Sequence, residues 1–230
     1  MSRPVVDPSR LVAVLLVVAS QLPSAPPSEL PVPAGQQLMR SLEASARHPR
    51  HLWRDSPPVN RDGTVNAYIE IPRGERRKFE FDMQKHERFI DRVMPDSLGG
   101  YPVNYGFVPQ TVSYDGDPFD ALVLGPPLPG GTSVKGTIVG LMHMEDENGI
   151  DSKVVLSLIG STGELLHPLR TEDQSRIGDY FSRYKQHEPG KFSKVPGWDS
   201  AERGQQFVRM THRFFLDCRK SPGTVCRVSQ

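Results

Sequence analysis

The most informative part of this chain is the stretch DGDPFD at residues 115–120, together with the apolar run ALVL at residues 121–124 that follows it. The stretch places three carboxylates within six residues, and no lysine or arginine lies between Val103 and Lys135 to neutralise them. At about 4 Å and an effective dielectric constant of about 20, each pair of these anions repels by about 4 kcal/mol. The apolar run is typical of a buried strand, so we expect the carboxylates at the rim of a core.

In a straight strand, Asp120 would point away from Asp115 and Asp117. Gly116 and Pro118 bend the backbone, and this bend would allow the three side chains to converge. Such a cluster is tolerable when it faces solvent, when one member is protonated or when it holds a cation. Oxygen-only ligands favour a hard divalent cation, so the run predicts a Mg²⁺ site. Taken alone, an acidic turn that faces water stays open as an alternative, whereas a calcium loop of the EF-hand kind fails on spacing.

Composition indicates one domain of ordinary size with an extension. The chain has 230 residues, a net charge of +1 and a sequence pI near 7.8, so it has no global field suited to nucleic acid or anionic membranes. Its two cysteines exclude a disulfide-rich scaffold and a cysteine-based zinc site. The seven histidines form no H-x-H or H-E-x-x-H pattern, and we do not interpret them as metal ligands.

The first sixty residues differ from the rest, because they hold ten of the 22 prolines and no alternating apolar pattern. We divide the chain into a predicted signal peptide at residues 1–25, a proline-rich linker or extension at 26–60 with a weak helical signal at 36–46, and a domain at 61–230. The uncharged run 11–22 follows a basic start and is too short to span a bilayer comfortably, so we expect export to the periplasm or the exterior. A cytoplasmic or organellar protein with a disordered leader is the alternative. Export would allow Cys218 and Cys226 to form a disulfide.

The order of the remaining elements indicates an α+β, mainly β, protein. Alternating or continuous apolar positions predict strands at residues 65–71, 78–82, 89–94, 119–124, 134–144 and 152–159. The last two are expected to pair antiparallel across the turn at 147–149, and residues 101–106 are expected to form a loop. Helices are expected at 171–186 and 200–215, and short strands followed by helices favour an α+β or small-barrel architecture.

A second group of charges lies at that turn. Asp146 and Glu147 end one predicted strand, Asp151 begins the next, and Lys153 shares the face of Asp151. Carboxylates followed at once by an ammonium group suit a site that binds a cation and an anion together. Taken alone, the same pattern is typical of a solvated hairpin tip.

In this order, these pieces resemble the family I soluble inorganic pyrophosphatases. The acidic run fits that family's D-G-D-P-x-D motif, and the resemblance extends from about Tyr68 to Trp198. The other matching pieces are IEIP at 69–72, KFE at 78–80, DR at 91–92, YPVNYG at 101–106, DE at 146–147 with Asp151 and Lys153, YK at 184–185, GK at 190–191 and GW at 197–198. The resemblance implies a five-stranded OB-type barrel with helices packed outside, the inorganic pyrophosphatase fold.

The resemblance also implies Mg-dependent hydrolysis of pyrophosphate to two phosphates by a metal-activated water, with Asp117 as the general base. Mn²⁺ or another divalent ion could replace Mg²⁺, and a homo-oligomer is expected. The implied metal ligands are Asp115, Asp120, Asp146, Asp151 and, through water, Glu70. The implied pyrophosphate-binding residues are Lys78, Arg92, Tyr105, Lys153, Tyr184 and Lys185. The implied supporting residues are Glu80, Tyr101 and Glu147.

Two other functions are alternatives to pyrophosphate hydrolysis. A non-catalytic OB module that binds single-stranded nucleic acid would need a basic groove with interleaved aromatic residues, but this chain places carboxylates there. A Mg²⁺ enzyme acting on another phosphoanhydride, such as tripolyphosphate or a nucleotide, is the second. The sequence has no glycine-rich nucleotide loop of the G-x-x-x-x-G-K-[ST] kind, and this favours pyrophosphate.

Overall fold

The structure is a computed structural model that describes residue 27 and residues 29–220. The predicted signal peptide and Cys226 lie outside these residues. Cys218, the other cysteine, is buried near the end of the last helix and is disulfide-bonded. In the described part of the chain, no helix is both long and apolar enough to cross a membrane.

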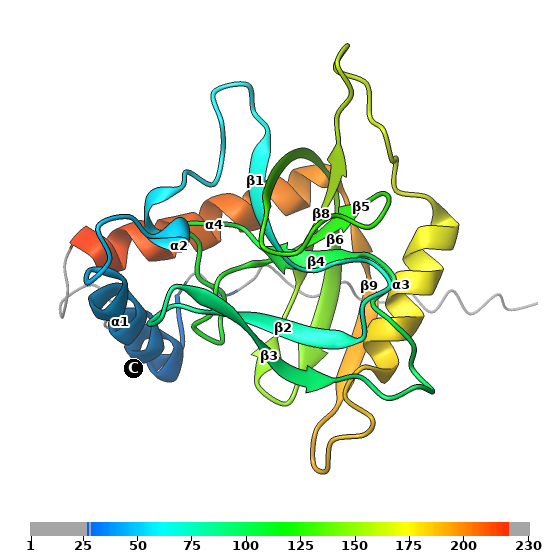
Figure 1. Ribbon diagram of the computed structural model, residues 1–230, viewed down its shortest axis with the longest axis horizontal. Helices are drawn as coiled ribbons and strands as arrows, with labels where there is room; N and C mark the ends of the chain where they lie inside the picture. The colour runs from blue at the N-terminus through cyan, green and yellow to red at the C-terminus, as the bar shows by residue number, and fades with distance from the viewer. Residues whose placement is uncertain (1–26, 28, 221–230) are drawn as a thin grey trace, which may run out of the picture.

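Five strands close into a ring, as the resemblance implied (Figure 1). The ring follows the order β1-β4-β5-β8-β6 and is closed by pairing of β6 with β1. All of these pairs are antiparallel except β5 with β8. The five strands are β1 (Val65–Ile71), β4 (Asn104–Phe107), β5 (Asp120–Leu124), β6 (Ser133–Asp146) and β8 (Lys153–Leu158).

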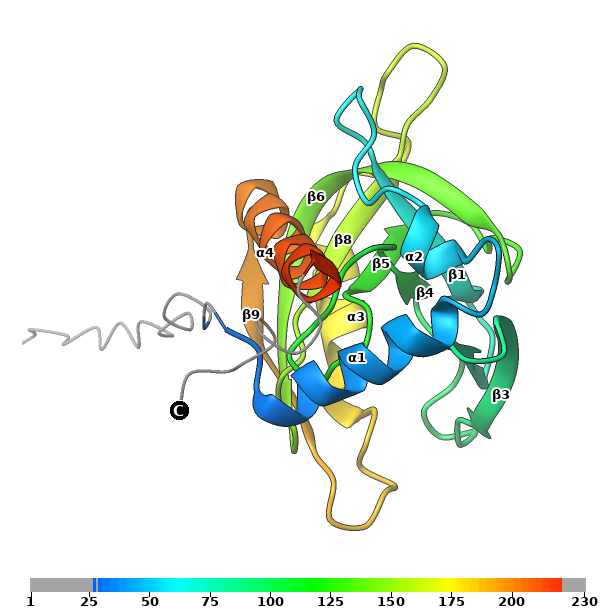
Figure 2. The same cartoon turned by 90° about the vertical axis from the view of Figure 1, so that its left-hand side faces the viewer.

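The remaining elements extend or cover this ring. Two further strands, β7 (Gly149–Ile150) and β9 (Ser193–Asp199), pair with β6. A separate hairpin consists of β2 (Arg77–Asp82) and β3 (Glu87–Val93). The helix α3 (Thr171–Arg183) packs on β9, and α4 (Ala201–Lys220) packs on β6 and β8, so the two helices cover different parts of the ring (Figures 1 and 2).

The apolar run 121–124 is continuous because both faces of β5 are buried. Leu122 and Leu124 pack in a core with Phe181 of α3. Ala121 and Val123 pack in a second core with Phe207 of α4. A strand between two cores has no polar face, and this explains why its sequence does not alternate.

Three strands were not predicted, and the shortest of them, β7, begins at the turn expected at residues 147–149. Residues 101–106, expected as a loop, contain most of β4, and β9 was missed altogether. In β4 the turn-forming glycine has a packing role, since a Cβ at Gly106 would lie 1.7 Å from the carbonyl oxygen of Tyr68 on β1. In β9, Pro196 and Gly197 hide the strand signal, and proline is tolerated there because, among the described residues, β9 pairs with β6 alone and forms an edge of the sheet. The predicted helix ends also shift, since α3 ends at Arg183 and α4 continues to Lys220.

The segment expected as a linker carries two helices, α1 (Val32–Ser45) and α2 (Leu52–Asp55). The weak helical signal at 36–46 is thus confirmed, and the helix begins earlier. Leu38 of α1 and Trp53 of α2 are buried in a third core with Phe215 of α4. The indole Nε1 of Trp53 donates to the carbonyl oxygen of Thr111 at 2.9 Å, so this segment is part of the folded body.

We expect Trp53→Ala to lower the free energy of unfolding by about 3–5 kcal/mol, because it removes a buried aromatic side chain and leaves a cavity. Urea unfolding followed by circular dichroism measures this change. Val59→Ala is the matched control, since Val59 is exposed. A loss below about 1 kcal/mol for Trp53→Ala would show that the segment behaves as a linker.

Candidate active site

A cavity of about 250 Å³ opens where the ends of β1, β5 and β8 meet the β2–β3 hairpin and the end of α3. It brings together twelve of the fifteen predicted site residues, from segments more than a hundred positions apart. These twelve are Glu70, Lys78, Glu80, Tyr105, Asp115, Asp117, Asp120, Asp146, Asp151, Lys153, Tyr184 and Lys185. The other three, Arg92, Tyr101 and Glu147, do not line the cavity but contact residues that do.

The acidic run reaches the cavity through a tight bend. Gly116 has a φ of +94°, which glycine adopts without strain, and the backbone N–H of Asp117 donates to Oδ1 of Asp115 at 2.9 Å. Both carboxylates keep contact with solvent through the cavity, but the surrounding protein removes much of their hydration. This desolvation and the neighbouring anions raise the pKa of Asp115 to about 7 and the pKa of Asp117 to about 6.

Lys153 lies between two carboxylates of the site. Its side chain is 2% exposed, and its Nζ lies 2.5 Å from Oδ2 of Asp120 and 2.8 Å from Oδ1 of Asp151. The parallel pairing of β5 with β8 sets Ala121 opposite Val154 and thereby brings Asp120 beside Lys153. Burial disfavours the charge of Lys153, but the two carboxylates outweigh this effect and raise its pKa. For Asp151 burial dominates, and its pKa rises to about 7.

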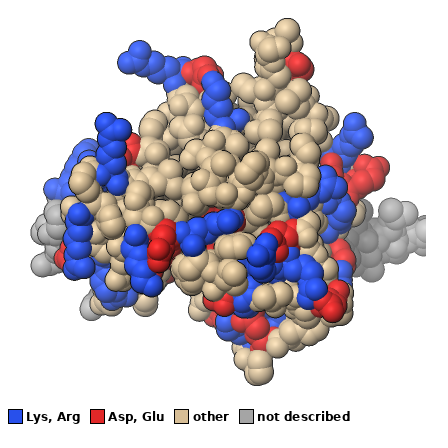
Figure 3. Space-filling view, in the orientation of Figure 1, with Lys and Arg blue, Asp and Glu red and all other residues tan. Residues whose placement is uncertain are grey.

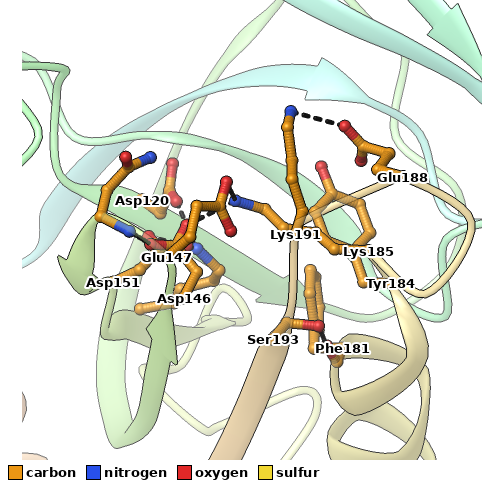
Figure 4. Close-up of polar contacts among 12 residues, drawn as sticks. Asp120, Asp146, Glu147, Asp151, Phe181, Tyr184, Lys185, Glu188, Lys191 and Ser193 are labelled. Atoms are coloured by element: carbon orange, nitrogen blue, oxygen red, sulfur yellow. Dashed lines mark hydrogen bonds and ion pairs between the residues drawn. The ribbon is translucent and has the colours of Figure 1, made fainter.

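A second lysine binds the hairpin predicted to carry charges. Nζ of Lys185, just after α3, lies 2.6 Å from Oδ2 of Asp146 and 2.9 Å from Oε1 of Glu147 (Figure 4). Asp146 also accepts a bond from the backbone N–H of Asn148 at 2.7 Å, which fixes the turn. Burial opposes the charge of Lys185, and the bonds to the two carboxylates more than offset it and raise its pKa.

The β2–β3 hairpin supplies the third lysine. Nζ of Lys78 forms an ion pair with Glu80 and lies 3.2 Å from Oδ2 of Asp91. Beside it, Glu70 on β1 is buried and accepts the backbone N–H of Phe81 at 2.7 Å. Burial and the nearby charge of Asp120 raise the pKa of Glu70 well above its ordinary value. The hairpin thus closes one side of the cavity with charges of both signs.

Tyrosines form the floor between these groups. Nζ of Lys153 lies 5.6 Å from the ring centroid of Tyr105, whose burial raises the pKa of its phenol. The hydroxyl of Tyr101 lies 3.3 Å from the hydroxyl of Tyr184. Arg92 lies over the ring of Tyr184, at 5.4 Å from its centroid, and pairs with Glu188 at 2.8 Å. Arg92 is therefore held beside the cavity, next to the Glu188–Lys191 ion pair seen in Figure 4.

Several site residues were not predicted from the sequence. Phe81, Met83, Phe107, Pro118 and Asn148 line the cavity without carrying charge. Gln37 of α1 bonds to Asp117, although the two lie 80 positions apart. Pro118 and Asn148 had local signals, the acidic motif and the turn after Glu147. The contact of Gln37 had none, because contacts between distant segments leave no pattern in a single sequence.

The donor set fits a hard cation, because every anionic group in the cavity is a carboxylate. Within residue 27 and residues 29–220, no three histidine, cysteine, aspartate or glutamate side chains form a group that could hold a metal ion. Asp115, Asp117 and Asp120 of the acidic run do converge on one cavity, and lysine ammonium groups bind Asp120 and the more distant Asp146 and Asp151. Burial raises the pKa values of Asp115, Asp117 and Asp151, so their ionised forms are disfavoured in the folded protein. Further positive charge in the cavity would stabilise these ionised forms.

The surface around the site mixes both signs of charge. Figure 3 shows lysine, arginine, aspartate and glutamate side chains intermingled over the β2–β3 side of this face, with few charges above them. Carboxylates and ammonium groups also lie together in the lining of the cavity. This arrangement defines the class of protein: one that handles a small, densely charged anion together with cations.

Comparison with known proteins identifies the family. Residues 67–215 match the family model described as inorganic pyrophosphatase. The inorganic pyrophosphatase of Sulfolobus acidocaldarius is 35% identical over 162 residues, which are 67% of this chain and 93% of that protein. Solved inorganic pyrophosphatases from Coxiella burnetii and Thermus thermophilus are 35% and 33% identical, with TM-scores of 0.65 and 0.66. The matches cover 70% and 73% of this chain and 99% of each of those chains.

The chain therefore belongs to the family I inorganic pyrophosphatases, a family of enzymes. The resemblance seen in the sequence is confirmed, and so is the mainly β fold with packed helices. The family model begins at residue 67, so α1 and α2 precede the matched region.

The raised carboxyl pKa values predict how stability depends on pH. Between about pH 4 and pH 7, folded metal-free protein binds protons at Asp115 and Asp151 that the unfolded chain, with pKa values near 3.8, does not bind. Stability contributed by these groups is thus present below pH 4 and lost as pH rises toward 7. We expect the free energy of unfolding to fall less across this window for Asp115→Asn than for the wild type.

Urea unfolding in the presence of a chelator, from pH 4 to pH 8, measures the difference between the two proteins. Asp96→Asn is the control, because the Asp96 side chain is 86% exposed, and its curve should run parallel to that of the wild type. If the Asp115→Asn curve also ran parallel, the carboxyl of Asp115 would not be protonated in the folded protein.

Proposed function

We propose that this chain hydrolyses pyrophosphate to two phosphates in a reaction that depends on Mg²⁺, with Asp117 as the general base. The observation that carries the proposal is one cavity that gathers the ammonium groups of Lys78, Lys153 and Lys185 among carboxylates. A lone phosphate site would not need the carboxylates, and a lone metal site would not need the lysines. Together they suit an anion that arrives with divalent cations.

The volume of the cavity supports a small substrate. At about 250 Å³ it lies below the roughly 300–1,000 Å³ typical of sites for drug-sized ligands. Pyrophosphate has no base or sugar to place, and twelve of the seventeen residues that line the cavity are charged residues or tyrosines, with apolar side chains only at Phe81, Met83, Phe107 and Pro118. Pyrophosphate is therefore favoured over a nucleotide.

Asp115, Asp120, Asp146 and Asp151 would hold Mg²⁺, with Glu70 acting through water. When bound, Mg²⁺ neutralises phosphate oxygens and lowers the pKa of water. Mn²⁺ fits the same oxygen donors. The carboxylates of Asp120 and Asp151 now bind Lys153, so that ammonium group would be shared between them and a phosphate oxygen.

The cationic side chains would bind and orient the phosphates. Lys78, Lys153 and Lys185 reach the cavity from the hairpin, the ring and the end of α3, so they can approach an anion from different directions. Tyr105 and Tyr184 line the same space, and their hydroxyl groups would donate to phosphate oxygens. Negative charge spreads over these oxygens as the phosphoryl group transfers, and donors held in place stabilise it. Arg92, just behind Tyr184, adds positive charge to this side.

Asp117 differs in its partner from three of the carboxylates proposed to hold Mg²⁺. Asp120, Asp146 and Asp151 are each bound by a lysine, whereas Asp117 accepts a bond from the neutral amide of Gln37. Desolvation and neighbouring anions raise the pKa of Asp117 to about 6, which is close to the value of a general base that works near neutral pH. Asp117 would take the proton of the attacking water.

We expect the wild type to release phosphate from pyrophosphate when Mg²⁺ is present and not when it is chelated. Asp117→Asn should lower kcat about 100- to 10,000-fold, because it removes the group that accepts the proton. A colorimetric phosphate assay on protein lacking residues 1–25 measures both effects, and tripolyphosphate and nucleotides in the same assay test other substrates.

Asp96→Asn is the matched control for this substitution, since it makes the same chemical change at an exposed position. Near-wild-type turnover of Asp117→Asn would contradict the role of Asp117. Binding of single-stranded DNA without any phosphate release would overturn the proposed function itself. Export and assembly into a homo-oligomer stay predictions of the sequence.

A further inference from the structure

The helix α1 lies against the acidic run, although it comes from the part of the chain that precedes the family match at residues 67–215 (Figure 2). Nε2 of Gln37 donates to Oδ1 of Asp117 at 2.5 Å. Hydrogen bonds from a donor to a charged carboxylate are shorter and stronger than neutral ones. An element outside the matched region therefore holds the carboxylate proposed as the general base.

The helix approaches the run closely because residue 116 has no side chain. A Cβ on Gly116 would lie 2.9 Å from the Cβ of Gln37 and 2.9 Å from the carbonyl oxygen of Ala34. Gly116 also adopts a φ of +94°, which bends the run toward α1. The same glycine thus forms the bend between Asp115 and Asp117 and leaves the space that α1 occupies.

The helix itself is fixed in place. Leu38, next to Gln37, is fully buried in the core that includes Phe215, and Ala34 is buried one turn earlier. The hydroxyl of Tyr114, directly before the acidic run, donates to the carbonyl oxygen of Pro27 at 2.6 Å, before α1 begins. The backbone on both sides of the Gln37–Asp117 bond is therefore anchored, and this keeps the amide of Gln37 within reach of Asp117 although the bond itself is exposed.

We propose that Gln37 is a positioning residue that fixes the rotamer of Asp117, so that Oδ1 stays with the amide and Oδ2 is left to accept the proton of the attacking water. This inference rests on the proposed function. An amide suits the task, because it does not titrate and its Nε2 can donate at any pH at which the enzyme works. A carboxylate free to rotate would spend part of its time with neither oxygen directed at the water.

The test compares kcat and KM for magnesium pyrophosphate among the wild type, Gln37→Leu and Gln37→Glu. Gln37→Leu keeps most of the side-chain volume and removes the donor, and it should lower kcat about tenfold. Gln37→Glu has the same shape as glutamine but presents a second anion to Asp117, so kcat should fall at least as far. KM should stay within about twofold in both variants, because Gln37 acts on the base and not on the binding of pyrophosphate.

Gln36→Leu is the matched control, since Gln36 is exposed on the neighbouring position of the same helix and its replacement should leave kcat unchanged. Urea unfolding of each variant shows the folded fraction, and kcat is expressed per folded molecule. A purely structural role for α1 would change the free energy of unfolding and leave kcat per folded molecule unaltered.

The outcomes distinguish a failure of the role of Gln37 from a failure of the proposed function. If the wild type turns over and both Gln37 variants keep its kcat per folded molecule, the role of Gln37 is wrong while the proposed function stands. An equal fall in the Gln36→Leu control, or a rise in KM with unchanged kcat, would also overturn it. If the wild type releases no phosphate from pyrophosphate, the proposed function fails and this inference fails with it.

Discussion

The buried ammonium group of Lys153 is the interaction on which the site depends. It lies between Asp120 at the start of β5 and Asp151 just before β8, and the lysine side chain is 2% exposed. Removing one partner from a buried ion pair typically costs about 3–5 kcal/mol, since the remaining charge keeps its desolvation penalty. Three charged groups can share this interior only because β5 and β8 lie side by side and in parallel.

The rest of the molecule serves to keep these groups in place. The apolar residues of β5 join two cores, one under α3 and one under α4, so the strand that carries Asp120 is packed on both faces. The end of α3 presents Tyr184 and Lys185, and the β2–β3 hairpin presents Lys78. Positive charge at the cavity is therefore spread over three separately anchored elements, whereas the carboxylates come mainly from the ring and its turns.

Much of this arrangement could be predicted because it is encoded locally. Alternating apolar residues revealed β1 and β2, and the charge pattern with the family motifs identified twelve residues that line one cavity. Other features depend on contacts between distant segments. The close approach of Gly106 to β1 makes a strand from a sequence that looks like a loop, and Pro196 and Gly197 conceal β9. The bond between Gln37 and Asp117 joins positions 80 residues apart, which no local pattern could reveal.

We expect this cavity to be stable with its full negative charge only when divalent cations join the lysines. Diffraction from a crystal soaked in Mn²⁺, recorded at the manganese edge, tests it most directly, because the anomalous signal locates the ion without any assumption about activity. We expect a strong peak inside the cavity, within about 2.5 Å of carboxylate oxygens of Asp115, Asp120 or Asp151. A cavity without any peak, or ions bound only at surface carboxylates elsewhere, would contradict it.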